Sequence, residues 1–166
     1  MLPKLQNQHA AAVALVIDDE GAVRALLRRM LAPELCQVLE AADGESGLRA
    51  IERSDPPVDI VLTDYIMPGL DGLDVLEVLA ENRPTLPVAI VSAHAGSIYM
   101  VQRRLGGQPR VLQKPFSEEA VKALTLELIT QARSARQEAE LQRMHLLQRD
   151  LVSAAWALHH SRHPGG

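Results

Sequence analysis

Residues 12–20 read AVALVIDDE, an uninterrupted apolar run that ends in acidic side chains. An apolar run of this length, without polar alternation, is typical of a strand buried on both faces of a sheet. Apolar residues then recur at positions 22, 23, 26, 27, 30 and 31, which places them on one face of a helix, and Pro33 ends that helix. The stretch therefore predicts a strand followed by a helix, which is the first unit of an α/β fold.

The same alternation continues along the chain. Further strands are predicted over residues 36–42, 58–64, 87–92 and 110–113, and further helices over residues 45–53, 73–79, 97–105 and 117–160. Five strands that alternate with helices favour right-handed crossovers and a doubly wound α/β fold with a parallel sheet covered on both faces.

The composition excludes several classes of protein. The chain has 166 residues, 17 basic against 21 acidic side chains, and only four aromatic residues. Nucleic-acid binding needs clustered positive charge and stacking rings, so we expect no nucleic-acid partner. The single Cys36 excludes an intrachain disulfide framework and any cysteine-based zinc site. The longest apolar run, residues 10–17, is much shorter than the ~20 residues of a membrane span, and residues 1–6 do not resemble a signal peptide. We therefore expect a cytoplasmic protein without membrane contact.

Polar side chains collect where the predicted strands end. The ligand site of an open α/β sheet lies beyond the carboxyl ends of its strands. The residues found there are Asp18, Asp19, Asp64, Ser92 and Lys114. Each has an ordinary explanation alone, such as a helix-terminal charge, a loop cap or an exposed lysine. Five of them at one edge of one sheet favour a functional site.

The residue types at this edge indicate phosphoryl chemistry. Three crowded carboxylates repel one another unless a cation lies among them, and oxygen ligands suit Mg²⁺. A hydroxyl and an ammonium group nearby can hold phosphoryl oxygens. Asp64 would then be a covalent nucleophile of the aspartyl-phosphate type.

Four segments carry a resemblance to a known family. They are residues 16–20 (VIDDE), 62–72 (LTDYIMPGLDG), 91–93 (VSA) and 113–116 (QKPF). Together they closely resemble the receiver domain of two-component response regulators, in the CheY-like superfamily. The resemblance implies a flavodoxin-like sheet with strand order 2-1-3-4-5, to which the helical pattern of residues 117–160 adds an extended C-terminal helix.

The resemblance also implies a division of the chain. Residues 1–10 would be an N-terminal tail, and residues 11–130 the receiver domain. Residues 131–160 would be a helical extension that forms a coiled coil or leads to an absent output domain. Residues 161–166 would be a disordered tail.

The resemblance assigns the acidic residues their roles. Asp64 would accept a phosphoryl group from a sensor histidine kinase, a phosphotransfer protein or a small phosphodonor. Asp18, Asp19 and Asp64, with the backbone carbonyl of Ile66, would bind Mg²⁺. The protein would therefore be a phosphoacceptor, with self-catalysed transfer and dephosphorylation, and not an enzyme.

The remaining site residues would serve the phosphoryl group. Ser92 would hydrogen-bond to it and move with it, and Lys114 would pair with it. The peptide bond before Pro115 is expected to be cis, a form essentially confined to proline.

Three modulating positions are Ile66, His94 and Val111. Ile66 is apolar where many relatives carry a polar side chain, and it would shield the acyl phosphate from water. His94 is either an exposed loop histidine or a group that tunes water access. Val111 stands where the family usually has a tyrosine or phenylalanine that rotates inward, so the usual aromatic readout is in doubt.

The predicted last helix is far longer than a receiver domain needs. Two apolar runs lie along it, one over residues 128–139 and one comprising Met144, Leu147, Leu151, Ala154 and Leu158. They share no register, so a stutter near Leu141 is required. The spacing predicts a coiled-coil homodimer or a docking helix, unless the helix folds back on its own domain. The histidines at 159, 160 and 163 lie in the terminal segment, where a metal site is not favoured.

Two other functions remain open. One is an interaction module that dimerises without phosphorylation, which Val111 leaves possible although the acidic site opposes it. The other is a Mg²⁺-dependent phosphohydrolase, which would need a second acid where Ile66 stands.

Overall fold

The structure is a computed structural model that describes residues 11–31, 35–93, 99, 103 and 110–161. By the density of its backbone contacts the chain divides into two compact units, Met1–Ala132 and Arg133–Gly166. The sequence-predicted boundary at residue 130 lies two residues before the end of the first unit. The predicted helix over residues 97–105 lies outside the described residues except at positions 99 and 103. The predicted tails over residues 1–10 and 161–166 also lie outside them, except for Ser161, which is the last residue of the long helix.

The described part of the first unit contains a five-stranded parallel sheet with strand order β2-β1-β3-β4-β5. The strands are β1 (Ala12–Ile17), β2 (Cys36–Ala41), β3 (Ile60–Asp64), β4 (Val88–Ser92) and β5 (Arg110–Gln113). The helices are α1 (Gly21–Leu31), α2 (Gly44–Arg53), α3 (Gly72–Asn82) and α5 (Glu118–Ser161), which continues into the second unit. This is the predicted flavodoxin-like sheet, and its strand order is confirmed.

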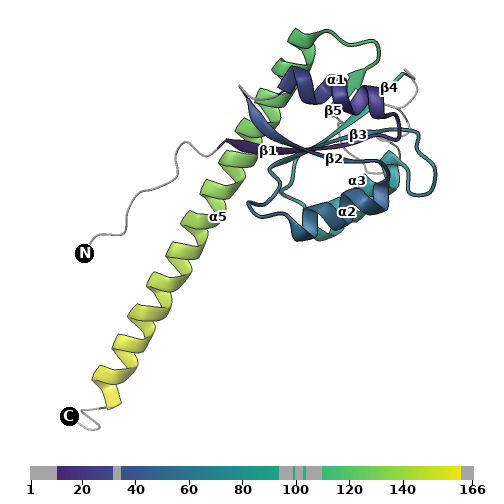
Figure 1. The fold of residues 1–166 in the computed structure, drawn as a ribbon. Helices are drawn as coiled ribbons and strands as arrows, with labels where there is room; N and C mark the ends of the chain where they lie inside the picture. Colours follow the sequence, from purple (N-terminus) through teal and green to yellow (C-terminus); the bar gives the residue numbers. More distant parts are fainter. Residues whose placement is uncertain (1–10, 32–34, 94–98, 100–102, 104–109, 162–166) are drawn as a thin grey trace. The chain divides into compact units, whose positions relative to one another are not determined.

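Helices cover both faces of the sheet (Figure 1). Leu27 of α1 and Leu128 of α5 pack on one face, in a core with alternate residues of β1, β3 and β4. Val75 and Leu79 of α3 pack on the other face, together with Ile51 of α2. Burial of β1 on both faces explains why its sequence is uniformly apolar.

β3 begins at Ile60, two residues later than the sequence predicts. The reason is a side chain that replaces a backbone partner. Asp59 lies just before the strand, and its carboxylate accepts a hydrogen bond of 2.7 Å from the Val13 N–H. The Asp59 N–H in turn donates to the Val13 carbonyl at 2.8 Å. The backbone N–H and carbonyl of Val13 in β1 therefore both have hydrogen-bond partners, although β3 begins only at Ile60. The other strand boundaries differ from the predicted ones by at most one residue.

The first apolar run of the last helix does not belong wholly to an extension. Leu128 and Ala132 are buried in the core of the first unit, with Val121. They pack there because the amino-terminal turns of α5 cover the sheet. Leu128 and Ala132 therefore belong to the part of the helix that packs on the sheet, and only the later members of the run over residues 128–139 lie in the second unit. The predicted start at Ser117 is confirmed, since its hydroxyl oxygen accepts a hydrogen bond from the Ala120 N–H.

Candidate phosphoryl site

Asp18 follows β1 and is held on all sides. Its side chain is almost wholly buried, at 1% exposure. Its N–H donates to the Ala41 carbonyl, and its carboxylate Oδ1 accepts from the Glu20 N–H at 2.8 Å. Burial raises the pKa of Asp18 above its ordinary value, although the hydrogen bond from Glu20 and the ammonium of Lys114 oppose that rise.

Asp64 is the last residue of β3, and the loop after it is built to hold it in place. Gly69 has a backbone φ of +78°, a conformation that favours glycine. Asp71 caps α3 by accepting hydrogen bonds from the backbone N–H groups of residues 73 and 74. Gly72 lies so close to the Asp64 carbonyl that any side chain there would collide with it. The motif around Asp64 is thus a tight turn that brings the chain back against the backbone of Asp64.

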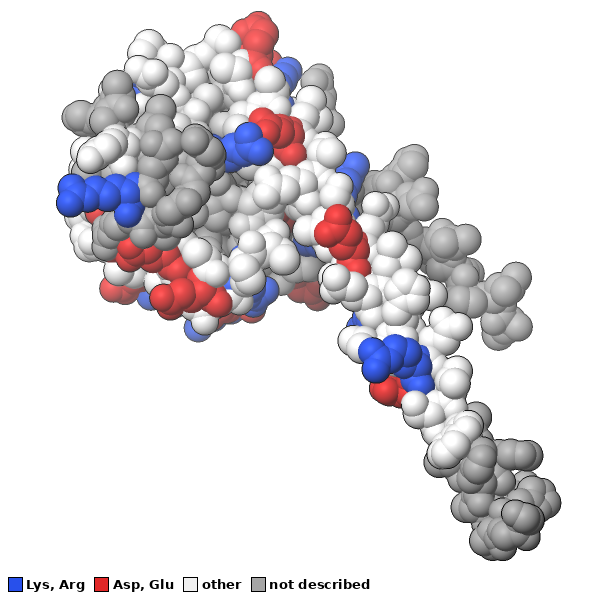
Figure 2. Space-filling view, turned by 180° about the vertical axis from the view of Figure 1, so that it is seen from behind, with Lys and Arg blue, Asp and Glu red and all other residues white. Residues whose placement is uncertain are grey.

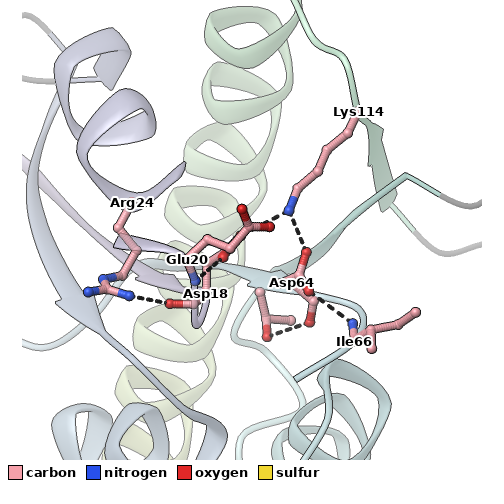
Figure 3. Close-up of polar contacts among 7 residues, drawn as sticks. Asp18, Glu20, Arg24, Asp64, Ile66 and Lys114 are labelled. Atoms are coloured by element: carbon pink, nitrogen blue, oxygen red, sulfur yellow. Dashed lines mark hydrogen bonds and ion pairs between the residues drawn. The ribbon is translucent and has the colours of Figure 1, made fainter. Parts of the chain in front are cut away.

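Lys114 joins the two buried acids (Figure 3). Its Nζ donates to Asp64 Oδ1 at 2.7 Å and to Asp18 Oδ2 at 3.1 Å. Burial alone would lower the pKa of Lys114, but its hydrogen bonds to the two carboxylates and their charges raise it above its ordinary value. The ammonium group is therefore charged at neutral pH and neutralises one of the two acids. The second oxygen of Asp64, Oδ2, accepts from the Ile66 N–H at 3.0 Å.

A cleft of about 280 Å³ opens over Asp64. Its walls are formed by Asp19, Glu20, Asp64, Tyr65, Ile66, Ser92, Ala93 and Lys114. The structure thus brings together the predicted residues Asp19, Asp64, Ser92 and Lys114. Asp18 is not among the residues that line the cleft; its buried carboxylate contacts the Lys114 ammonium instead.

The oxygen donors at the cleft fit Mg²⁺ in their chemistry. Asp19 and Glu20 are exposed carboxylates on the same cleft as Asp64. Among the residues that the structure describes, no group of three or more histidine, cysteine or acidic side chains is arranged to hold a metal ion. Mg²⁺ takes one or two carboxylates and keeps several waters, and the cleft has room for those waters.

The sequence analysis did not single out Arg24. Its guanidinium donates to the Asp18 carbonyl and contacts the Glu40 carboxylate of β2 at 3.6 Å. Arg28 holds the same Glu40 carboxylate at 2.8 Å. Arg24 and Arg28 are four residues apart on one helix face, and this spacing could have indicated that both contact one acidic side chain. Arg24 therefore fixes the backbone where the acidic segment begins.

The modulating positions differ in what the structure describes of them. Ile66 is 58% exposed at the rim of the cleft. Val111 is half-buried in β5, and His94 lies outside the described residues. The Lys114–Pro115 bond is cis, the form that the resemblance implied, and a second cis bond, at Asp55–Pro56, was not predicted.

With this geometry established, the chain can be compared with known proteins. Residues 14–125 match the sequence profile described as the response regulator receiver domain. The chain belongs to this family. The receiver domain thus accounts for the sheet, the acidic edge and the cleft.

Relatives and solved structures agree with the assignment. The chain is 32% identical over 145 residues to the DNA-binding transcriptional regulator NtrC of Proteus hauseri. The aligned region covers 86% of this chain and 30% of the relative. A response regulator receiver domain from Clostridium thermocellum superposes with a TM-score of 0.67 at 27% identity, covering 75% of this chain and 98% of the other. NtrX of Brucella abortus superposes with a TM-score of 0.69 at 29% identity, covering 80% of this chain and 30% of the other. The chain therefore spans about a third of the full-length regulators it resembles. None of the described helices is long and apolar enough to cross a membrane.

Proposed function

We propose that this receiver is a phosphoacceptor in two-component signalling, in which Asp64 takes a phosphoryl group from a sensor histidine kinase or a phosphotransfer protein. One observation carries the proposal. Asp64 lines the cleft, and the charged Nζ of Lys114 lies 2.7 Å from its carboxylate Oδ1. An acceptor carboxylate beside a fixed positive charge is what transfer of an anionic phosphoryl group requires.

The transfer step is a substitution at phosphorus. A carboxylate oxygen of Asp64 forms a P–O bond while the P–N bond to the donor imidazole breaks. The leaving imidazole keeps the electron pair and takes a proton, and the three phosphoryl oxygens move with the phosphorus. Hydrolysis later returns Asp64 and inorganic phosphate, so the chain acts as an acceptor with self-catalysed transfer and dephosphorylation.

The chain's own residues would stabilise the transferred group. Lys114 already donates to Asp64 Oδ1, and its ammonium can turn from the Asp18 carboxylate to a phosphoryl oxygen. Ser92 lies on the same cleft, so its hydroxyl can donate to a second phosphoryl oxygen. Tight packing around the loop after Asp64 keeps the acceptor in position.

Asp18, Asp19 and Asp64, with the Ile66 carbonyl, would hold Mg²⁺. The ion would neutralise charge on the transferring phosphoryl oxygens. Because Lys114 bridges two of these acids, its movement toward the phosphoryl group would free the Asp18 carboxylate for the ion.

The extension would form a homodimer through α5. In the described part of the second unit, seven large apolar side chains on this helix are exposed: Leu141, Met144, Leu146, Leu147, Leu151, Val152 and Trp156. On the face that Figure 2 shows, the charged side chains of this helix lie in separate small groups among uncharged ones. An isolated helix with such a surface is only marginally stable in water. The helix of a second copy carries the same spacing of apolar residues and can pack against it. A following output domain, a cytoplasmic location and the absence of nucleic-acid binding remain predictions.

A second candidate is constitutive dimerisation that does not depend on phosphorylation. Val111 favours it, because the family's usual aromatic readout is missing from β5. The acidic cleft favours the phosphoacceptor.

Incubation with acetyl phosphate and Mg²⁺ tests the proposal. Intact-mass measurement should show one added phosphoryl group that is stable in acid and labile in base. The matched Asp64→Asn variant should acquire none. Absence of an adduct on the unmodified chain would favour constitutive dimerisation, and rapid multiple turnover of a phosphate ester would indicate a phosphohydrolase.

A further inference from the structure

One aromatic ring lines the phosphoryl cleft among the residues described, and it belongs to Tyr65. The whole chain has four aromatic residues. Phe116 packs against the opposite core, with α1 and α5. Tyr99 is 63% exposed, and Trp156 lies in the second unit. Tyr65 is therefore the aromatic side chain best placed to sense the state of Asp64.

Tyr65 also packs against the core beside β4. A small buried cluster is formed by Leu73 of α3 and Ile90 of β4, and Tyr65, Leu76 of α3 and Val111 of β5 pack against it. Val111 occupies the position at which the family usually carries a ring. A valine is small, so the aromatic surface at this cluster comes from Tyr65, the residue that follows β3. One half-buried residue thus lines the cleft and packs against the same cluster as Val111.

The backbone of Tyr65 is fixed, which confines any response to its side chain. Its N–H donates to the Val91 carbonyl at 2.9 Å, and its carbonyl accepts from the Gly72 N–H at 3.1 Å. With both backbone groups bonded, rotation of the ring is the movement with the lowest cost.

We infer that Tyr65 is the positioning residue that transmits the state of the phosphoryl site to β4 and β5, in place of an aromatic residue at position 111. A phosphoryl group on Asp64 adds bulk and negative charge beside the ring. The ring then shifts against Ile90, which is paired in register with Val111 of β5, because close-packed side chains respond to added volume by rearranging. This inference rests on the proposed function, since phosphorylation supplies its input.

Fluorine NMR on the full chain tests the inference. The protein is produced with fluorotyrosine, which labels Tyr65 and Tyr99 alone. Tyr65→Phe and Tyr99→Phe variants assign the two signals. Mg²⁺ and beryllofluoride, a mimic of the phosphoryl group, are then added. The same spectrum reports bound beryllofluoride and the surroundings of each ring.

We expect bound beryllofluoride to shift the Tyr65 signal while the exposed Tyr99 signal stays in place. Bound beryllofluoride with an unchanged Tyr65 signal would overturn the inference and leave the proposed function intact. Absence of bound beryllofluoride would overturn the proposed function, and the inference with it.

Hydrogen exchange of the strands provides a second readout. Beryllofluoride should change amide exchange in β4 and β5 of the unmodified chain and of the Tyr65→Phe variant, which keeps the ring. In the Tyr65→Leu variant this change should be lost, with the beryllofluoride signal used to compare samples at equal occupancy. An equal change in Tyr65→Leu would show that another route connects the site to β5.

Discussion

At the scale of single residues, the motif around Asp64 separates into chemistry and geometry. Asp64 faces the cleft, whereas Met67 is buried in the core. Gly69 and Gly72 serve the backbone, one through its positive φ and the other through its close approach to Asp64. Within this sequence motif, Asp64 therefore faces the cleft, while Met67, Gly69 and Gly72 fix the loop that positions it.

Ile66 is expected to lengthen the life of the phosphoryl group. Its exposed side chain lies at the rim of the cleft, where it would exclude water from an acyl phosphate on Asp64. The Ile66→Asn variant should lose its phosphoryl group several-fold faster, because an amide can hydrogen-bond an attacking water. Phosphate release after removal of excess acetyl phosphate measures the rate. Equal rates for the two proteins would contradict this role.

Cys36 should be unreactive in the folded protein. Burial raises the pKa of its thiol from the ordinary 9.0 to about 11, and the nearby Asp59 charge adds to the rise. The thiolate is the reactive form, and its fraction at pH 8 is then about one in a thousand. Iodoacetamide should label the native protein slowly, faster as pH rises toward 11, and rapidly at pH 8 in urea. Since Cys36 is the only cysteine, Cys36→Ser gives the blank.

At the scale of elements, three of the four described helices begin where a side chain accepts hydrogen bonds from their first N–H groups. Asp43 caps α2, Asp71 caps α3 and Ser117 caps α5. Gly47 in α2 packs directly on Ile17, so the residue that weakens this helix also lets it approach the sheet. Sequence periodicity located these helices to within a few residues because cap, apolar face and breaker all lie close together in the chain.

Removal of the α3 cap should destabilise the domain measurably. Asp71 Oδ1 accepts from the Leu73 N–H at 2.8 Å and from the Asp74 N–H at 2.9 Å. In turn, the Asp74 carboxylate accepts a hydrogen bond from the Asp71 N–H. Asp71→Ala should lower the free energy of unfolding by about 1 kcal/mol, within a range of about 0.5–2 kcal/mol. Urea denaturation followed by circular dichroism measures it. Asp71→Ser keeps an acceptor oxygen and should lose less; an equal loss would rule out the cap as the cause.

At the scale of the whole molecule, the chain combines a packed receiver with a helical segment whose large apolar residues face solvent. The core of the first unit takes Leu128 and Ala132 from α5. Beyond residue 132, the described side chains are exposed or half-buried. Association with another chain would bury the apolar side chains of the second unit.

Dimerisation should depend on one face of α5. Leu146 and Leu147 are almost equally exposed, at 57% and 55%, but they project from different sides of the helix. Leu147 shares the stripe of Met144 and Leu151, whereas Leu146 does not. Leu147→Asp should shift the protein from dimer to monomer in sedimentation velocity, and the matched Leu146→Asp variant should not. Equal behaviour of the two variants, or a monomeric parent protein, would contradict dimerisation through this stripe.

The sequence by itself determined the order of strands and helices and the acidic edge of the sheet, because those features depend on periodicity and on which residues end each strand. Only the tertiary structure decided how the edge is arranged. It places the Lys114 ammonium between Asp18 and Asp64, brings Arg24 to the Asp18 carbonyl, and packs Tyr65 and Val111 against one small cluster. These relations connect residues on different elements, and their distances follow from sheet register and packing, which no local pattern in the chain encodes.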